Sequence, residues 1–125
     1  MVGNAAVVNF AYESFLRGDV QGVTDLLDPT IHWSVPESVP HGGEFHGLDE
    51  VGTFFEGLGA AWRPLALEIE AVDEVGADLV VGIVQVSGTL GGSGVSYGSV
   101  HVFTVRDGKI TRFREFVDLN ACLAG

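Results

Sequence analysis

The stretch HVFTVRDGKITRFREFVD, residues 101–118, decides how this sequence can fold. Apolar and polar residues alternate on both sides of Asp107-Gly108, a dipeptide typical of the tight turn between two antiparallel strands. The pattern therefore predicts a β-hairpin. His101 and Glu115 lie among its aromatic and branched apolar residues, so the register of the two strands determines whether these polar side chains meet.

One possible register has a two-residue turn. If Asp107 and Gly108 alone form the turn, His101 lies opposite Arg114. Glu115 then faces the other side of the sheet, because successive side chains of a strand alternate between its faces. This register gives no joint site for His101 and Glu115.

The other possible register has a three-residue turn over residues 106–108 with a glycine bulge. His101 then lies opposite Phe113 and Ser99 opposite Glu115, so that His101 and Glu115 share a face. We favour this register because it directs the arginines of the second strand to water and the phenylalanines to the interior. The residues that it gathers on one face are His101, Phe103, Val105, Phe113, Glu115 and Val117.

The chain before the hairpin divides into a mostly helical first half and a β-rich second half. Its spacing of apolar residues and its Gly and Pro positions predict the elements in order. They are a helix ending near Gly18, a short helix from Asp19 to Leu27, a short strand over 31–36, a loop over 37–47, a helix over 48–62, and strands over 65–72 and 78–90. The hairpin completes four longer strands in an antiparallel meander. We expect one α+β domain over residues 1–125, with three N-terminal helices packed on one face of a curved, mostly antiparallel sheet that encloses an apolar pocket.

Composition excludes several classes of partner. Seventeen acidic residues against six basic ones give a formal charge of -11, which repels nucleic acid and anionic lipid surfaces. The first residues lack a basic segment and reach Glu13 early, so they predict neither a signal peptide nor a membrane span. The single cysteine, Cys122, cannot form an intrachain disulfide, and a cytoplasmic location is compatible with that.

Several segments together resemble the SnoaL-like polyketide cyclases, a branch of the nuclear transport factor two and ketosteroid isomerase superfamily. The resemblance covers roughly residues 5–120 and is carried by GD after the first helix, IHWSVP, FHGLDEVGTFF and VHVFTVRDGKITRFREFVD. It implies a cone-shaped fold and a cofactor-independent cyclase or isomerase that acts on a hydrophobic, oxygenated small molecule. It also implies a homodimer formed through the outer face of the sheet, and the strand around DLVVGIVQV, apolar on both faces, agrees with two-sided burial.

The resemblance assigns roles to the two polar residues of the hairpin. In these cyclases an inward histidine precedes the DGKI turn and an acid/base aspartate follows it, and these positions match His101 and Glu115. Independently of the resemblance, a carboxylate among Phe113, Val117 and Trp33 is partly desolvated, which raises its pKa toward values useful for proton transfer, whereas a protonated histidine nearby lowers it. His101 can donate a hydrogen bond to a developing enolate or alkoxide oxygen.

A second candidate chemistry is the opening of an epoxide by water. The segment FREFVDL resembles one in limonene-epoxide hydrolases, whose water-holding tyrosine and asparagine match His32 and Ser34. The arginine and second aspartate of those enzymes fall on Ile83 and Gln85, which departs from their mechanism. A noncatalytic ligand-binding or interaction module is the third reading.

The remaining site candidates come from the strands and the first helix. His32 is a third candidate catalytic residue, but it alternates with Trp33, so only one of the two can point into the pocket. His41 and His46 flank GGEF without an evident third ligand, and we predict no metal site there. The predicted substrate-binding residues are Tyr12, Trp33, Ser34, Gln85, Tyr97, Phe103, Phe113 and Val117.

Overall fold

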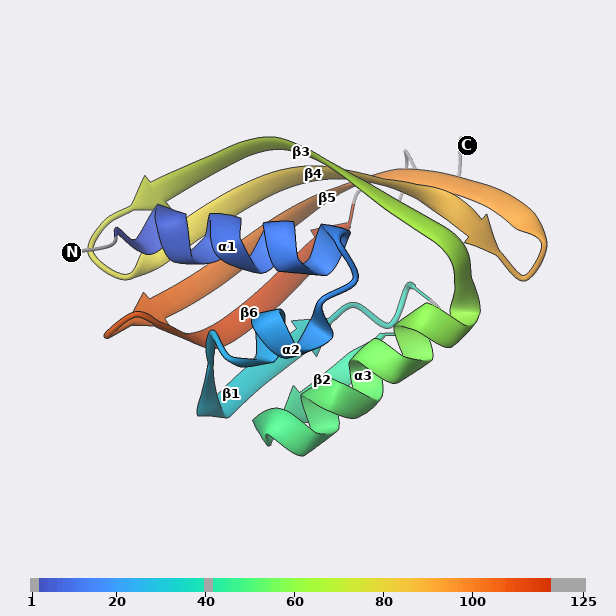
Figure 1. Ribbon diagram of the computed structural model, residues 1–125. Helices are drawn as coiled ribbons and strands as arrows, with labels where there is room; N and C mark the ends of the chain where they lie inside the picture. Colours follow the sequence, from blue (N-terminus) through green and yellow to red (C-terminus); the bar gives the residue numbers. More distant parts are fainter. Residues whose placement is uncertain (1–2, 40–41, 118–125) are drawn as a thin grey trace.

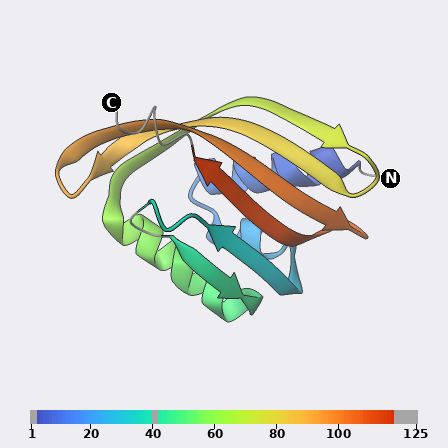
Figure 2. The ribbon, with the colours of Figure 1, turned by 180° about the vertical axis from the view of Figure 1, so that it is seen from behind.

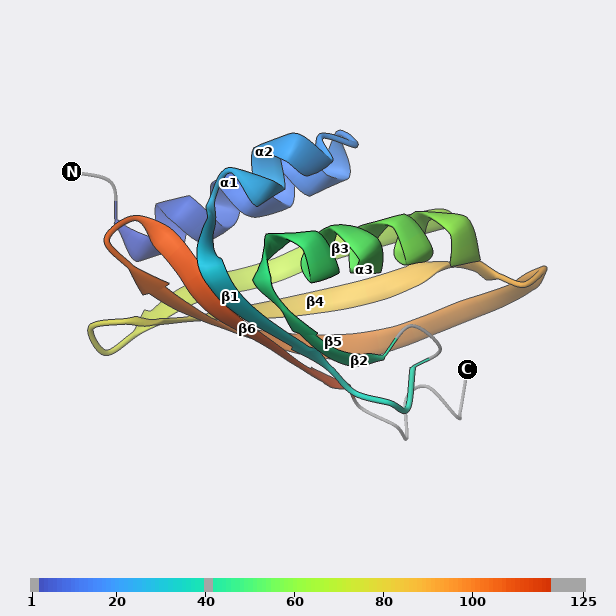
Figure 3. The ribbon, with the colours of Figure 1, turned by 90° about the horizontal axis from the view of Figure 1, so that it is seen from below.

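The computed structural model describes residues 3–39 and 42–117, which form a curved six-stranded sheet with helices on its concave side. The helices are α1 (Asn4–Leu16), α2 (Val20–Thr24) and α3 (Gly47–Ala61). The strands are β1 (Leu27–Val35), β2 (Gly43–His46), β3 (Trp62–Val75), β4 (Leu79–Leu90), β5 (Ser93–Arg106) and β6 (Lys109–Val117). Figure 3 shows all three helices on the same side of the sheet, and Figure 2 shows the sheet from behind. The predicted α+β class is confirmed.

The sheet order β2-β1-β6-β5-β4-β3 explains where a concavity forms. Strands β3 to β6 make the predicted antiparallel meander, and β1 joins the sheet by pairing parallel to β6. Helix α1 lies across β3, β4 and β5, whereas α3 packs on β1 and β2 (Figure 1). The inner side chains of β4, β5 and β6 therefore face a space that is bordered by two helices.

Helix α1 ends and α2 begins where the sequence predicts. Gly18 has a φ of 77°, and its N–H donates to the carbonyl of Phe15 while the N–H of Asp19 donates to the carbonyl of Ser14, a Schellman-type end. The carboxylate of Asp19 then accepts from the N–H of Gly22 at 2.8 Å and caps α2. The sharp turn that results sets the two helices side by side over the pocket.

Two helices end earlier than predicted and the strands that follow them also begin earlier, so that two prolines expected at the helix ends lie inside strands. Helix α2 ends at Thr24, and Pro29 lies inside β1, at a stretch that β6 does not pair continuously. Helix α3 ends at Ala61, and Pro64 lies inside the edge strand β3, where a missing N–H is tolerated.

The predicted loop over 37–47 also contains a strand. The four residues of β2 pair antiparallel with β1, with Trp33 opposite Phe45. GEFH is short and lies between glycines, so its strand character comes from pairing with β1 and not from its own pattern.

The hairpin turn is shorter than we predicted, so the three-residue turn is wrong. Arg106 pairs with Lys109, and Asp107 and Gly108 alone form the turn with φ of 53° and 77°. Positive φ at both central residues matches the type I′ turn, whose twist suits a two-residue hairpin.

A bulge further along β6 restores the predicted face. Between the pairs Val105–Ile110 and Thr104–Arg112, Thr111 is an extra residue on β6. The bulge shifts the register by one, so that His101 pairs directly with Glu115 and the two side chains share the concave face. The shared face was predicted correctly, but the structural reason for it is a bulge at Thr111.

The core fills the space between the helices and the concave face. Its fully buried side chains come from every layer: Val8, Ile31, Val51, Val80, Val84, Val105 and Ile110. None of the helices in the described residues has the length and apolar character needed to cross a membrane.

Candidate active site

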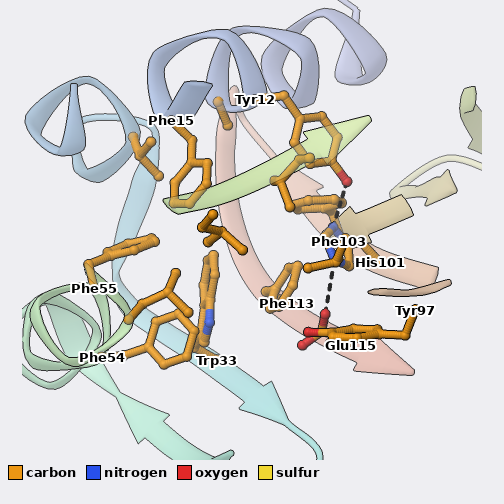
Figure 4. Close-up of a pocket in the computed structure, with 16 residues that line it drawn as sticks. Tyr12, Phe15, Trp33, Phe54, Phe55, Tyr97, His101, Phe103, Phe113 and Glu115 are labelled. Atoms are coloured by element: carbon orange, nitrogen blue, oxygen red, sulfur yellow. Dashed lines mark hydrogen bonds and ion pairs between the residues drawn. The ribbon is translucent and has the colours of Figure 1, made fainter. Parts of the chain in front are cut away.

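A pocket opens between α1, α3 and the concave face of the sheet (Figure 4). It encloses about 640 Å³ of space outside the protein atoms, part of which is open to solvent. Most of its wall is apolar. The lining residues are Ala11, Tyr12, Phe15, Val23, Trp33, Phe54, Phe55, Leu58, Leu65, Leu67, Val86, Tyr97, His101, Phe103, Phe113 and Glu115.

A chain of hydrogen bonds crosses one side of this apolar pocket. The Tyr12 hydroxyl lies 2.7 Å from Nδ1 of His101, and Nε2 of His101 lies 3.3 Å from Oε2 of Glu115. The hydroxyl of Ser99 donates to the same carboxylate oxygen at 2.7 Å. The side chains of His101 and Glu115 are each only 8% exposed, so the pair is held away from bulk water.

Residues from three elements build this chain. Ser99 and His101 lie two apart on β5 and share its concave face, and Glu115 faces His101 across the β5–β6 ladder. Tyr12 reaches the histidine from the inward side of α1, where it is 7% exposed. Its ring stacks on the imidazole with centroids 5.8 Å apart.

Gly82 on β4 provides the room for the Tyr12 hydroxyl. Gly82 pairs directly with His101, and a side-chain carbon at Gly82 would overlap the hydroxyl oxygen. The absence of a side chain at this one position therefore allows the tyrosine to reach the imidazole.

The positions of the protons on Tyr12, His101 and Glu115 follow from which atoms donate and which accept. Burial raises the pKa of Tyr12 far above its usual range, and the nearby charge of Glu115 raises this pKa further. Tyr12 thus stays a neutral phenol. An ionised Glu115 can only accept, so Nε2 of His101 must carry a proton toward it, and in the neutral imidazole Nδ1 then accepts from Tyr12.

The opposite side of the pocket is aromatic. Trp33 stacks on Phe113 with centroids 4.0 Å apart, and Phe54 and Phe55 of α3 contact its other side (Figure 4). The indole Nε1 of Trp33 is buried and has no hydrogen-bond partner among the described residues. A flat, apolar ligand fits such a wall.

Three predicted site residues lie outside the pocket. His32 and Ser34 alternate with Trp33 on β1, and since Trp33 faces the pocket, both point to the outer side of the sheet. Gln85 is exposed on β4 between the buried residues Val84 and Val86. The assignment of His32 to catalysis, and of Ser34 and Gln85 to substrate binding, is therefore wrong.

His32 and Ser34 instead hold a surface carboxylate. Nε2 of His32 lies 2.8 Å from Oε1 of Glu44, and the Ser34 hydroxyl donates to Oε2 of the same residue. The hydrogen bond from Ser34, and then that from His32, lowers the pKa of Glu44. The ring of His46 stacks on His32 with centroids 4.4 Å apart. Within residues 3–39 and 42–117 there is no group of three side chains that could hold a metal ion, and His41 lies outside these residues.

The other predicted pocket residues mostly lie where the sequence places them. Tyr12, Trp33, Tyr97, Phe103 and Phe113 all line the pocket. The exception is Val117, which packs against the core on the same strand face as Glu115 but is not part of the lining.

Sequence reasoning missed two kinds of contributors. Ser99 donates to the carboxylate; the favoured register had placed it opposite Glu115 without a role, although its position two residues before His101 on one strand is a signal that could have assigned it to the site. Phe54 and Phe55 were predicted only as part of the helix over residues 48–62, because nothing in the spacing of their apolar side chains distinguishes a pocket wall from a core.

Comparison with known proteins assigns this architecture to a family. The family model described as "SnoaL-like domain" matches residues 8–113. An NTF2-like protein from Burkholderia thailandensis is 26% identical and superposes with a TM-score of 0.90 over 99% of this chain and 97% of its own. TerC, crystallised with polyporic acid, is 27% identical with a TM-score of 0.81 over 92% of this chain and 91% of its own.

A more distant structure shares the fold alone. An LEH-like epoxide hydrolase from M. tuberculosis is 16% identical, with a TM-score of 0.78 over 94% of this chain and 84% of its own. A search of curated proteins found no match.

Proposed function

Because the chain belongs to the SnoaL-like domain family, we propose that it is an acid/base enzyme of the cyclase or isomerase type, acting on a hydrophobic, oxygen-bearing small molecule. The observation that carries this proposal is the hydrogen-bonded chain of Tyr12, His101 and Glu115 inside an otherwise apolar pocket. Titratable groups that converge in an apolar cavity are the usual arrangement of a proton-transfer site.

Each of the three hydrogen-bonded residues has a distinct role in this proposal. Glu115 accepts a proton from the substrate and returns it at another atom, and burial in the pocket keeps water from competing. His101 donates its Nε2 proton to the carboxylate and thereby holds the carboxylate in place. Tyr12 fixes the orientation of the imidazole ring.

The pocket wall supports the proposed substrate class. Its side chains are mainly aromatic and aliphatic, and a net charge of -11 disfavours polyanionic ligands. The similarity to TerC, which was crystallised with polyporic acid, agrees with a small organic ligand.

The positions of His32 and Ser34 argue against the alternative of epoxide hydrolysis. It required Glu115 to activate a water held by His32 and Ser34, and both of these residues lie on the outer side of the sheet, bonded to Glu44. A noncatalytic binding module stays the competing outcome of the experiments below.

A generic substrate for a buried base tests the proposal without knowledge of the natural one. In 5-nitrobenzisoxazole a carboxylate removes the proton on the carbon next to the ring nitrogen, the electrons of that C–H bond complete a nitrile, and the N–O bond breaks and leaves its electrons on the oxygen of a coloured phenolate. We expect the wild-type protein to accelerate this elimination. Glu115→Gln should slow it by about 100- to 10,000-fold, because the amide keeps the shape of the side chain but cannot take the proton.

A surface variant controls for nonspecific effects. Glu68→Gln removes a carboxylate from an exposed position of β3, outside the pocket, and its rate should equal that of the wild type. Equal rates for the wild type and Glu115→Gln would refute Glu115 as the base. Tight binding of a lipophilic ligand without any turnover would then favour the binding module.

We also propose that the protein is a homodimer through the outer face of the sheet. Ile83, Val100 and Phe116 form a row across β4, β5 and β6 on the face opposite the helices, and Phe116 is 51% exposed. An apolar row on a sheet face that no helix covers is typical of an interface.

A further inference from the structure

The indole N–H of Trp33 is the one pocket group in the described chain that is both buried and without a hydrogen-bond partner. Trp33 is 7% exposed, and the rings that contact it belong to Phe54, Phe55 and Phe113, which offer no oxygen or nitrogen acceptor. Buried polar groups in native proteins are nearly always paired, and an unpaired one calls for an explanation. Trp33 lines the pocket, so a molecule bound there can supply the missing acceptor.

We propose that the Trp33 N–H donates a hydrogen bond to an oxygen of the bound substrate and thereby selects ring compounds that carry a carbonyl or enolate oxygen. Tryptophan can only donate, so its partner must be an acceptor. The surrounding rings select a flat apolar body, and the N–H selects the oxygen on it. This inference rests on the proposed function, because it assumes that a small molecule occupies the pocket.

The fold keeps the indole from finding another partner. Trp33 lies opposite Phe113 on β6 and Phe45 on β2, so its strand is fixed on both sides. Its ring stands between the phenylalanines of α3 and Phe113, and reaching water would require it to leave this packing (Figure 4). The acceptor therefore has to come to the indole by way of the pocket, and because the indole nitrogen has almost no exposed surface, the neighbouring rings have to move to admit it.

The same site contains the proposed base. Glu115 follows Phe113 by two residues on β6, so the backbones of Trp33 and Glu115 are about 8 Å apart on one face, given the usual strand spacings. A substrate of two fused rings spans such a distance. Its oxygen at Trp33 would be held while a proton is moved at the Glu115 end.

Indole NMR signals provide a direct test. The chain has two tryptophans, so the protein labelled with ¹⁵N gives two indole N–H signals, and Trp62 does not line the pocket. Titration with 1-indanone should move the Trp33 signal downfield, as expected when a carbonyl accepts from it, with a smaller change at Trp62. Indane, the same ring system without the oxygen, should bind more weakly and should cause no downfield shift.

A variant measures how much the N–H selects. The wild type should bind 1-indanone about 5- to 10-fold more tightly than indane, the ratio expected for one neutral hydrogen bond. Trp33→Phe removes the donor while it keeps an aromatic ring, so the ratio should fall to about 1. Thermal melting checks that this variant folds, and if it does not, the wild-type titration decides alone.

The outcomes separate this inference from the proposed function. A Trp33 shift with indanone in a protein that turns over no substrate would keep the inference and remove the enzyme. Turnover with an unmoved Trp33 signal would do the reverse. Equal affinity of the wild type for the two compounds, or binding of neither at its solubility limit, would overturn the inference.

Discussion

The substitution Gly82→Ala should break the contact between Tyr12 and His101, although neither of these two residues is itself changed. The added methyl group would overlap the Tyr12 hydroxyl, and two carbons of the Tyr12 ring would lie only 3.3 and 3.4 Å from it. Because Gly82 belongs to β4, which is paired with β3 on one side and β5 on the other, its backbone cannot easily move away. The tyrosine must therefore retreat and give up its 2.7 Å hydrogen bond.

The cost follows from the burial of this hydrogen bond. A net contribution of about 0.5–1.5 kcal/mol is lost with the bond itself, and a buried group left unpaired costs about 1–3 kcal/mol. We expect Gly82→Ala to lower the free energy of unfolding by about 2 kcal/mol, within that range, as measured by urea denaturation. Elimination of 5-nitrobenzisoxazole should slow as well, since the imidazole is no longer held.

A double-mutant cycle distinguishes this mechanism from a general loss of strand stability. In Tyr12→Phe the hydroxyl is absent, so the methyl group of Gly82→Ala meets no oxygen and should cost little. The two substitutions should therefore be nonadditive by about 1–2 kcal/mol, within the range seen for residues in contact. Gly82→Ala costing the same in both backgrounds would refute the proposed role of Gly82.

Three further outcomes follow from the site and the sheet. His101→Asn should slow the elimination less than Glu115→Gln does, because the histidine only orients the carboxylate, whereas the carboxylate takes the proton; a larger loss for His101→Asn would exchange their roles. Because the pKa of Tyr12 is raised in the folded state, the folded protein keeps a proton that the unfolded chain releases above about pH 10. The free energy of unfolding should therefore fall as the pH rises past about 10. Tyr12→Phe should make this fall less steep in urea titrations at about pH 9 to 11. Finally, the wild type should sediment as a dimer at micromolar concentration and Ile83→Glu as a monomer with an unchanged circular dichroism spectrum; a monomeric wild type would remove the dimer.

The sequence predicts which helices and strands form better than it predicts the residues at which they begin and end. Three helices and the meander of long strands follow from apolar periodicity and from turn residues such as Gly18 and Asp107-Gly108. Strand β2 was missed because four residues carry too short a pattern and depend on β1 for their structure. Pro29 and Pro64 were expected at helix ends, but each of these two lies within a strand that tolerates it.

The polar chain of the pocket depends on contacts that no local pattern contains. The Tyr12 hydroxyl bonds a histidine 89 residues away, in room left by Gly82 on a third element. The pattern of β1 alone likewise cannot decide between His32 and Trp33. Alternation shows that only one of them faces the pocket, and the choice falls to Trp33 because Phe54, Phe55 and Phe113 surround that side.

The hairpin did carry a signal for its true register, and it lies in the spacing of Ile110 and Phe113. Both are buried, at 1% and 4% exposure, although residues three apart on a regular strand face opposite sides. Two buried apolar residues at odd spacing require one extra residue between them, which is the bulge at Thr111. With a two-residue turn and no bulge, burying Ile110 would expose Phe113 and turn Glu115 to the outer face. The bulge therefore lets one strand fill the core at its start and present a carboxylate to the pocket near its end.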